Sequence, residues 1–80
     1  MKIIIAGAGE VGTHLAKLLS RQEQDIILID NDEEKLRELD ANYNLMTVIG
    51  NPTAFQTLKQ AQVYKADLFI AVMPFESRNI

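Results

Sequence analysis

Residues 2–12 have the sequence KIIIAGAGEVG, which joins an apolar run to a glycine-rich segment. The apolar run at residues 3–6, closed by Gly7, is typical of a strand buried on both faces. From Val11 onward, apolar residues recur at helical spacing. Residues 7–12, between these two segments, match G-x-G-x-x-G, a pattern that is informative only where it follows a strand and opens a helix. The stretch therefore predicts a strand, a glycine turn and a helix in direct succession.

The three glycines have distinct expected roles. Gly7 would allow the sharp turn, Gly9 would let the backbone approach a pyrophosphate, and Gly12 would let the helix pack closely against the strand. The free N–H groups at the start of the helix would then face the phosphates. A simpler interpretation, in which the glycines only make a tight turn and Asp30 only caps a helix, stays open. The inward face of the helix is expected to carry Val11, Leu15, Leu18 and Leu19.

A carboxylate follows the second apolar run. Residues 26–29 end at Asp30, close to the spacing of about 20 residues after the glycines that the dinucleotide fingerprint requires. A carboxylate there accepts hydrogen bonds from ribose hydroxyls and repels a 2′-phosphate, and Asn31 and Asp32 follow it instead of an arginine. The sequence therefore favours NAD(H) over NADP(H). Glu10, in the first turn of the preceding helix, is either an exposed charge that suits the helix dipole or a residue that weakens highly charged ligands such as ATP.

The remainder of the chain repeats the alternation of strands and helices. Asn31 or Asp32 can cap a second helix that ends near residues 42–44. A third helix is short, and Thr53 is its expected cap. Strands are expected at residues 45–49 and 68–72, a further helix from residue 76, and apolar helix positions at Leu36, Leu39, Phe55, Leu58 and Ala61.

The order β-α-β-α-β-α-β with short connections predicts a doubly wound parallel sheet with helices on both faces. This is a truncated Rossmann-like fold in three α/β/α layers. A full sheet of this class has about six strands, more than the four expected here. We therefore expect residues 1–80 to be the N-terminal part of an NAD-binding Rossmann domain and a fragment of a longer protein. The unfinished sheet would expose apolar surface through which the chain could pair with a second copy.

Two later positions are candidates for contact with the same ligand. Asn51, in the turn after the third strand, either hydrogen-bonds an adenine edge or serves only the turn. Met73 follows the fourth strand at the crevice where such sheets bind ligands, although Pro74 beside it can simply begin a helix. The expected cofactor-binding residues are Gly7, Ala8, Gly9, Glu10, Val11, Gly12, Asp30, Asn31, Asp32, Gly50, Asn51 and Met73.

Composition excludes several classes of protein. The 80 residues are 48% hydrophobic and 24% charged, which is typical of one small globular domain and not of a disordered chain. The absence of cysteine excludes disulfides and thiolate metal sites, and we expect no bound metal. A net charge of −3 without a basic patch argues against nucleic acid as a partner. No apolar run approaches the about 20 residues that a membrane span needs, so the cytosol is the expected compartment.

The chain resembles the N-terminal nucleotide-binding domain of the Trk/Ktr potassium-uptake regulators, known as the TrkA N-terminal or RCK domain. The resemblance covers essentially the whole chain and begins with residues 1–12. It includes Asp30 and Asp32 after the second strand. At residues 50–53 the family has Gly-Asp-Ala-Thr and this chain has Gly-Asn-Pro-Thr. Further matches are Ala66-Asp67, Ala71-Val72 and Asn79, and further departures are Met73, where the family has Thr, and the Phe-Glu-Ser stretch at residues 75–77.

The resemblance implies a cytoplasmic regulatory subunit that is not an enzyme. In such proteins NADH or NAD, and in some members ATP or ADP, binds the glycine loop and changes the arrangement of domains in a ring under a membrane potassium channel. The implied partners are that channel or transporter subunit and, in the full-length form, further copies of the same protein. The alternative is the cofactor-binding half of an NAD-dependent dehydrogenase, with its substrate domain beyond residue 80. The resemblance implies phosphate contacts at Gly7, Gly9 and Gly12, a ribose contact at Asp30 and adenosine contacts at Asp32 and Asn51.

Overall fold

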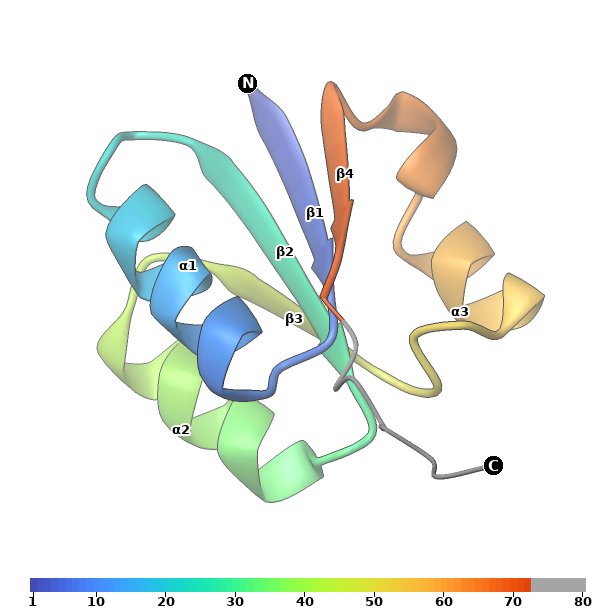
Figure 1. Cartoon of the computed structure of the whole chain (residues 1–80), viewed down its shortest axis with the longest axis horizontal. Coiled ribbons are helices and arrows are strands. Elements are labelled where there is room, and N and C mark those ends of the chain that lie inside the picture. Colours follow the sequence, from blue (N-terminus) through green and yellow to red (C-terminus); the bar gives the residue numbers. More distant parts are fainter. Residues whose placement is uncertain (73–80) are drawn as a thin grey trace, which may run out of the picture.

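Strands and helices alternate along residues 1–72, the part of the chain that the computed structural model describes (Figure 1). The predicted order is confirmed, and the strands begin or end within one residue of the predicted positions. A short 3₁₀ helix before the last strand was not predicted, and the helix expected from residue 76 lies outside the described residues. The elements are β1 (Lys2–Ala6), α1 (Glu10–Ser20), β2 (Asp25–Asp30), α2 (Glu33–Asn42), β3 (Met46–Ile49), α3 (Phe55–Gln60), the 3₁₀ helix η1 (Val63–Lys65) and β4 (Leu68–Ala71).

The four strands form one parallel sheet in the order β3-β2-β1-β4. This confirms the predicted parallel, Rossmann-like α/β fold. β2 lies beside β1, and β3 lies beside β2 on the same side. The chain then crosses to the other side of β1 to form β4. The strand order therefore reverses between β1 and β4, and in open sheets of this class ligands bind at the carboxyl ends of the strands at such a point.

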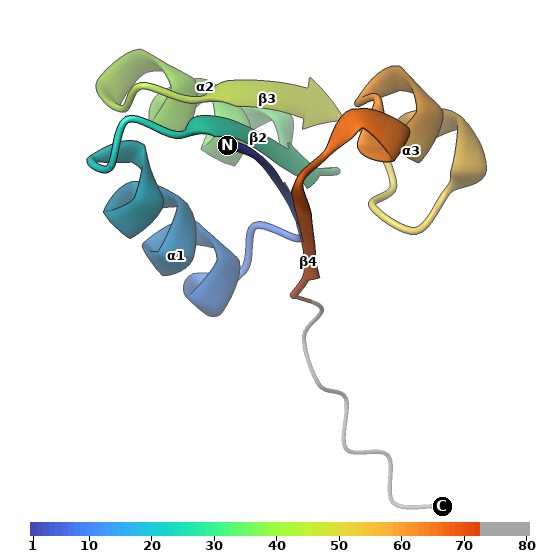
Figure 2. The ribbon, with the colours of Figure 1, turned by 90° about the horizontal axis from the view of Figure 1, so that it is seen from above.

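Helices cover both faces of the sheet, as Figure 2 shows. On one face, Ile3 and Ile5 of β1 pack in a buried cluster with residues of α1, β2 and α2. On the other face, Ile4 packs with Ile29 of β2 and with Ala61 at the end of α3. Because successive side chains of a strand point to opposite faces, β1 at the centre contributes to both clusters. The prediction that this strand is buried on both faces is confirmed.

The face by which α1 packs differs from the prediction. Val11 and Leu18, expected to point inward, are 65% and 47% exposed, whereas Gly12 and Ala16 are buried. Leu15 and Leu19 are partly buried and pack against the core, as expected. The small residues at its centre allow the helix backbone to approach the sheet more closely than a row of leucines would, which rotates Val11 and Leu18 toward the surface.

The start of α3 also differs from the prediction. The residue at the N-cap is Ala54, and no side chain among the described residues caps the helix. Thr53 instead donates its backbone N–H and its hydroxyl to the Asn51 side-chain oxygen, at 2.9 and 2.7 Å. Phe55, an expected apolar position of this helix, is 73% exposed. The Asn51 side chain organises the turn, so Thr53 is not available as a cap.

β4 forms one edge of the sheet. Of the strands in the described part of the chain, only β1 pairs with it. Leu68 and Phe69, which point to opposite faces of β4, are both partly exposed, at 44% and 41%. Apolar side chains are therefore exposed along this edge, and pairing with a second copy stays a prediction.

α2 has a side-chain cap at its start. Of the two predicted candidates it is Asp32 that occupies the N-cap, and its carboxylate accepts the Lys35 backbone N–H at 3.1 Å. Leu36 and Leu39 are buried, as predicted. The cap satisfies one of the free N–H groups that every helix start exposes.

We expect Asp32→Ala to lower the free energy of unfolding by about 1 kcal/mol, because the N-cap hydrogen bond is lost. For a domain of this size that corresponds to a fall in Tm of about 5 °C in thermal unfolding. Asp40→Ala, which removes the same charge from an exposed position of the same helix, is the control. Equal effects of the two substitutions would contradict the capping role.

Candidate functional site

The candidate site lies at the carboxyl ends of the strands, where three loops meet. Backbone hydrogen bonds continue the sheet past the strand ends and connect these loops. The Gly7 N–H donates to the Ile29 carbonyl at 2.8 Å, and the Gly50 N–H donates to the Asp30 carbonyl at 2.9 Å. The loops after β1, β2 and β3 therefore begin side by side, next to the point where the strand order reverses.

Two of the glycines in the loop after β1 are required by the fold itself. Gly7 has a φ of 115°, a conformation that side chains disfavour. A Cβ atom on Gly12 would lie 2.0 Å from the Gly7 carbonyl oxygen, which is backbone and has no rotamer to change. The expected roles of these two residues, a sharp turn and close packing of α1 on β1, agree with this geometry.

Gly9 differs from both of them. Its φ of −71° and ψ of −168° are open to any residue, and a Cβ atom placed on it would have no heavy atom within 4 Å. Neither the backbone conformation nor the packing of the described residues requires a glycine here. Gly9 is also the N-cap of α1, and no side chain in residues 1–72 caps that helix. The backbone is therefore open at the N-terminus of α1, where N–H groups attract anions.

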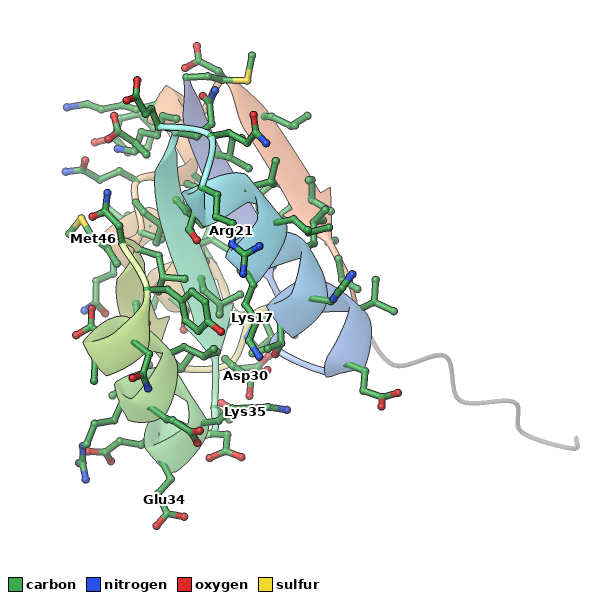
Figure 3. The ribbon with its side chains drawn as sticks, turned by 90° about the vertical axis from the view of Figure 1, so that its left-hand side faces the viewer. Lys17, Arg21, Asp30, Glu34, Lys35 and Met46 are labelled. Carbon is green, nitrogen blue, oxygen red and sulfur yellow. The ribbon has the colours of Figure 1, made fainter. Side chains whose placement is uncertain are left out.

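Asp30 connects the end of β2 to the glycine loop. Its Oδ2 accepts the Ala8 N–H at 2.6 Å, and its Oδ1 accepts the Asp32 N–H at 3.0 Å. The side chain is partly buried. Figure 3 shows it at the end of the β2 ribbon, in the region between α1 and the start of α2. An ionised carboxylate has about four lone-pair sites, so about two remain for other donors.

The loop after β3 favours the simpler interpretation of Asn51. Its side-chain oxygen is used twice by Thr53 within the turn, which leaves the side-chain nitrogen as the group that could donate to a ligand. Gly50 lies against Thr57, whose hydroxyl oxygen would be 2.6 Å from a Cβ atom at that position. The hydrogen bonds of the turn therefore account for Asn51, and the close approach of Thr57 accounts for Gly50.

The structure brings most of the predicted site residues to this one edge of the sheet. The side chains of Glu10, Val11 and Asn31 are exposed there. Met73 lies outside the described residues. One contact was not predicted from the sequence: the Thr13 hydroxyl donates to the Ala8 carbonyl at 2.9 Å. A threonine one position after the third glycine is the only signal in the sequence, and it does not by itself indicate this contact.

Comparison with known proteins gives the family. Residues 3–80 match the model of the TrkA-N domain. The chain belongs to the TrkA-N domain family. The resemblance inferred from the sequence is thereby confirmed, and it covers nearly the whole chain.

Relatives of this TrkA-N domain carry the name Trk system potassium uptake protein TrkA. The protein from Halomonas elongata is 44% identical over 80 residues, and that from Haemophilus influenzae is 41% identical over 80 residues. Both alignments cover the whole chain and 18% of the relative. A homologue from Methanothermobacter thermautotrophicus is 32% identical, with 37% of its length covered. The TrkA-N domain described here thus spans between 18% and 37% of the length of these relatives.

None of the helices in residues 1–72 combines the length and the apolar character that crossing a bilayer requires.

Proposed function

We propose that this TrkA-N domain binds NAD(H) at the carboxyl edge of its sheet and serves as a regulatory, non-enzymatic domain of a potassium uptake system. The observation that carries the proposal is the open space beside Gly9. A glycine that neither its own backbone conformation nor the surrounding packing requires is explained by a bound group that approaches the backbone closely. At the start of a helix, a pyrophosphate is the group that such an approach suits.

The neighbouring residues fit the other parts of the same ligand. The free lone pairs of Asp30 suit the two hydroxyls of an adenosine ribose, and the loops at residues 31–32 and 50–51 flank that side of the site. Ala8, Glu10 and Val11 would lie along the phosphates as part of the glycine loop. Asn51 would contribute at most its amide nitrogen to the adenine. The proposed contacts of Met73 rest on the sequence alone.

The carboxylate of Asp30 supports NAD(H) over NADP(H). A 2′-phosphate on the ribose would bring a second negative group against a carboxylate that the Ala8 and Asp32 N–H groups already orient. ATP and ADP carry the same free 2′-hydroxyl and therefore fit the ribose contact as well. Glu10, exposed in the first turn of α1, supports the dinucleotide over ATP because ATP carries more negative charge.

Calorimetric titration of the purified chain with NADH, NADPH, ATP and ADP tests the ligand. We expect NADH to bind at least about tenfold more tightly than NADPH, a difference of about 1.4 kcal/mol or more. Asp30→Asn should weaken NADH binding by about tenfold, because the charged acceptor of the ribose hydroxyls is lost, and should remove the discrimination against NADPH.

Asp40→Asn is the matched control for this substitution. Asp40 is exposed on α2, so the same change in charge should leave both affinities unaltered. If Asp30→Asn bound NADH as well as the parent chain does, Asp30 would not be the ribose contact. If the chain preferred ATP or ADP to NADH, the proposed ligand and the proposed effect of Glu10 would both be wrong. The location of the site would be unaffected.

The proposed regulatory role combines this site with the names of the relatives. Those proteins are named for potassium uptake, which supports a membrane potassium channel or transporter subunit as the partner. The domain would then act at the inner face of the cell membrane through that partner, in an assembly of several copies. A ligand shifts such an assembly only if it binds one arrangement better than another, so the affinity of the site must depend on the state of the partner.

A further inference from the structure

The peptide groups on both sides of Ala8 are fixed by side chains from two different elements. Its N–H donates to the Asp30 carboxylate at the end of β2, at 2.6 Å. Its carbonyl accepts the Thr13 hydroxyl from α1, at 2.9 Å. Thr13 also donates its own N–H to the Gly9 carbonyl at 2.9 Å. The glycine loop is therefore connected to both α1 and β2 around a residue whose side chain is a single methyl group.

The Thr13 contact is unusual for a threonine in a helix. A helical threonine hydroxyl commonly donates to the carbonyl four residues earlier in its own helix. Here that carbonyl, of Gly9, accepts the Thr13 N–H, and the hydroxyl reaches one residue further, to Ala8 in the loop. The Thr13 hydroxyl thus donates its hydrogen bond to the loop and not to a carbonyl of the helix.

Fixing the Ala8 carbonyl also orients the next N–H group. The peptide between Ala8 and Gly9 is planar and trans, so its C=O and its N–H point in opposite directions. With the carbonyl directed at Thr13, the Gly9 N–H points away from the Thr13 hydroxyl. A rotated peptide would instead turn the electronegative carbonyl oxygen toward the side that now presents the N–H.

We propose that Thr13 is a positioning residue that sets the Ala8–Gly9 peptide so that the Gly9 N–H is presented to a ligand phosphate. This inference rests on the proposed nucleotide-binding function and adds to it a residue that the glycine pattern does not include. Asp30 fixes the preceding peptide in the same way, but it also serves the ribose. Thr13 is therefore the residue whose removal affects the phosphate side of the ligand alone.

The test compares ligands with and without phosphate on matched variants of the chain. ADP and adenosine are titrated against the parent chain, Thr13→Val and Thr13→Ser, with binding followed by amide chemical shifts in ¹⁵N spectra. Thr13→Val keeps the size and branching of the side chain and removes only the hydroxyl. It should weaken ADP binding by about fivefold, the value of one lost hydrogen bond. It should leave adenosine binding unchanged. Thr13→Ser should restore the affinity for ADP.

Ser20→Ala is the control for loss of a hydroxyl from α1. The Ser20 hydroxyl donates to the Lys17 carbonyl at 2.8 Å, at the end of the helix far from the glycine loop along the chain. This variant should bind both ligands as the parent does. Residual dipolar coupling of the Gly9 N–H in the ligand-free chain gives an independent readout, and it should change in Thr13→Val and not in Ser20→Ala.

The outcomes separate this inference from the function on which it rests. If the parent chain binds neither ADP nor NADH, the proposed function fails and the role of Thr13 fails with it. If the parent binds and Thr13→Val binds ADP equally well, the function stands and the inference is overturned. Equal weakening of ADP and adenosine would also overturn it, because a general loss of structure would then explain the effect.

Discussion

Gly12→Ala should destabilise the chain by about 3 kcal/mol, the upper part of the range for overpacking a core. The added Cβ atom would lie 2.0 Å from the Gly7 carbonyl oxygen and 3.0 Å from its carbon, so α1 or the loop after β1 must move. A domain of this length is stable by only about 4–12 kcal/mol, so much of its stability would be lost. Urea unfolding followed by circular dichroism measures the change, and we expect the midpoint to fall.

The sign of this change is itself informative. Within a helix, replacing glycine by alanine ordinarily stabilises a protein by about 1 kcal/mol, because glycine has more conformational freedom to lose. Helix propensity and packing thus predict opposite signs at Gly12. An unchanged or raised midpoint would mean that α1 can move away from Gly7 at little cost, and the close approach of helix and strand would not be a requirement of the fold.

Much of the fold could be predicted from the sequence because its signals are local. The runs at residues 3–6 and 26–29 are apolar on both faces, which occurs in parallel strands covered by helices on both sides. Asp32 directly precedes the helix that it caps. The glycine pattern between a strand and a helix indicates the loop after β1. The spacing from Gly12 to Asp30 indicates that a carboxylate at the end of β2 lies beside this loop, and Asp30 does contact Ala8.

The errors arose where contacts between distant residues decide the outcome. Hydrophobic periodicity placed Val11 and Leu18 inward, but the packing of α1 is set by how closely Gly12 can approach the Gly7 carbonyl. Threonine is a common N-cap residue, but the Thr53 hydroxyl donates to the Asn51 side-chain oxygen and does not cap α3. In each case a specific contact outweighed the intrinsic preference of the residue.

The candidate site was predicted as a set of residues but not as a network. The sequence indicates that glycines, an acid and a helix start come together, because the carboxyl ends of parallel strands share one edge. It does not indicate that the Asp30 carboxylate accepts the Ala8 N–H of the glycine loop, or that the Thr13 hydroxyl donates to the Ala8 carbonyl. Both contacts depend on the path of the loop between its glycines.

Gly9→Ala should affect ligand binding more than stability, whereas Gly12→Ala should affect stability. The fold does not need a glycine at position 9. The backbone conformation suits alanine, and the Cβ atom would have no heavy atom within 4 Å. At an N-cap, alanine is less favourable than glycine, so we expect a loss of stability of about 1 kcal/mol or less. The chain should therefore remain folded, with a urea midpoint close to that of the parent.

Binding, in contrast, should be strongly affected by Gly9→Ala. If the open space is occupied by a pyrophosphate, a methyl group there displaces the ligand from the N–H groups of the loop, and the affinity for NADH should fall by about tenfold or more, or 1.4 kcal/mol. Calorimetry on the same samples used for unfolding measures both properties together. A folded Gly9→Ala chain that binds NADH as tightly as the parent would remove the observation on which the proposed function rests. A folded chain that has lost NADH while Gly12→Ala has lost its stability would separate the glycine that serves the ligand from the glycine that serves the fold.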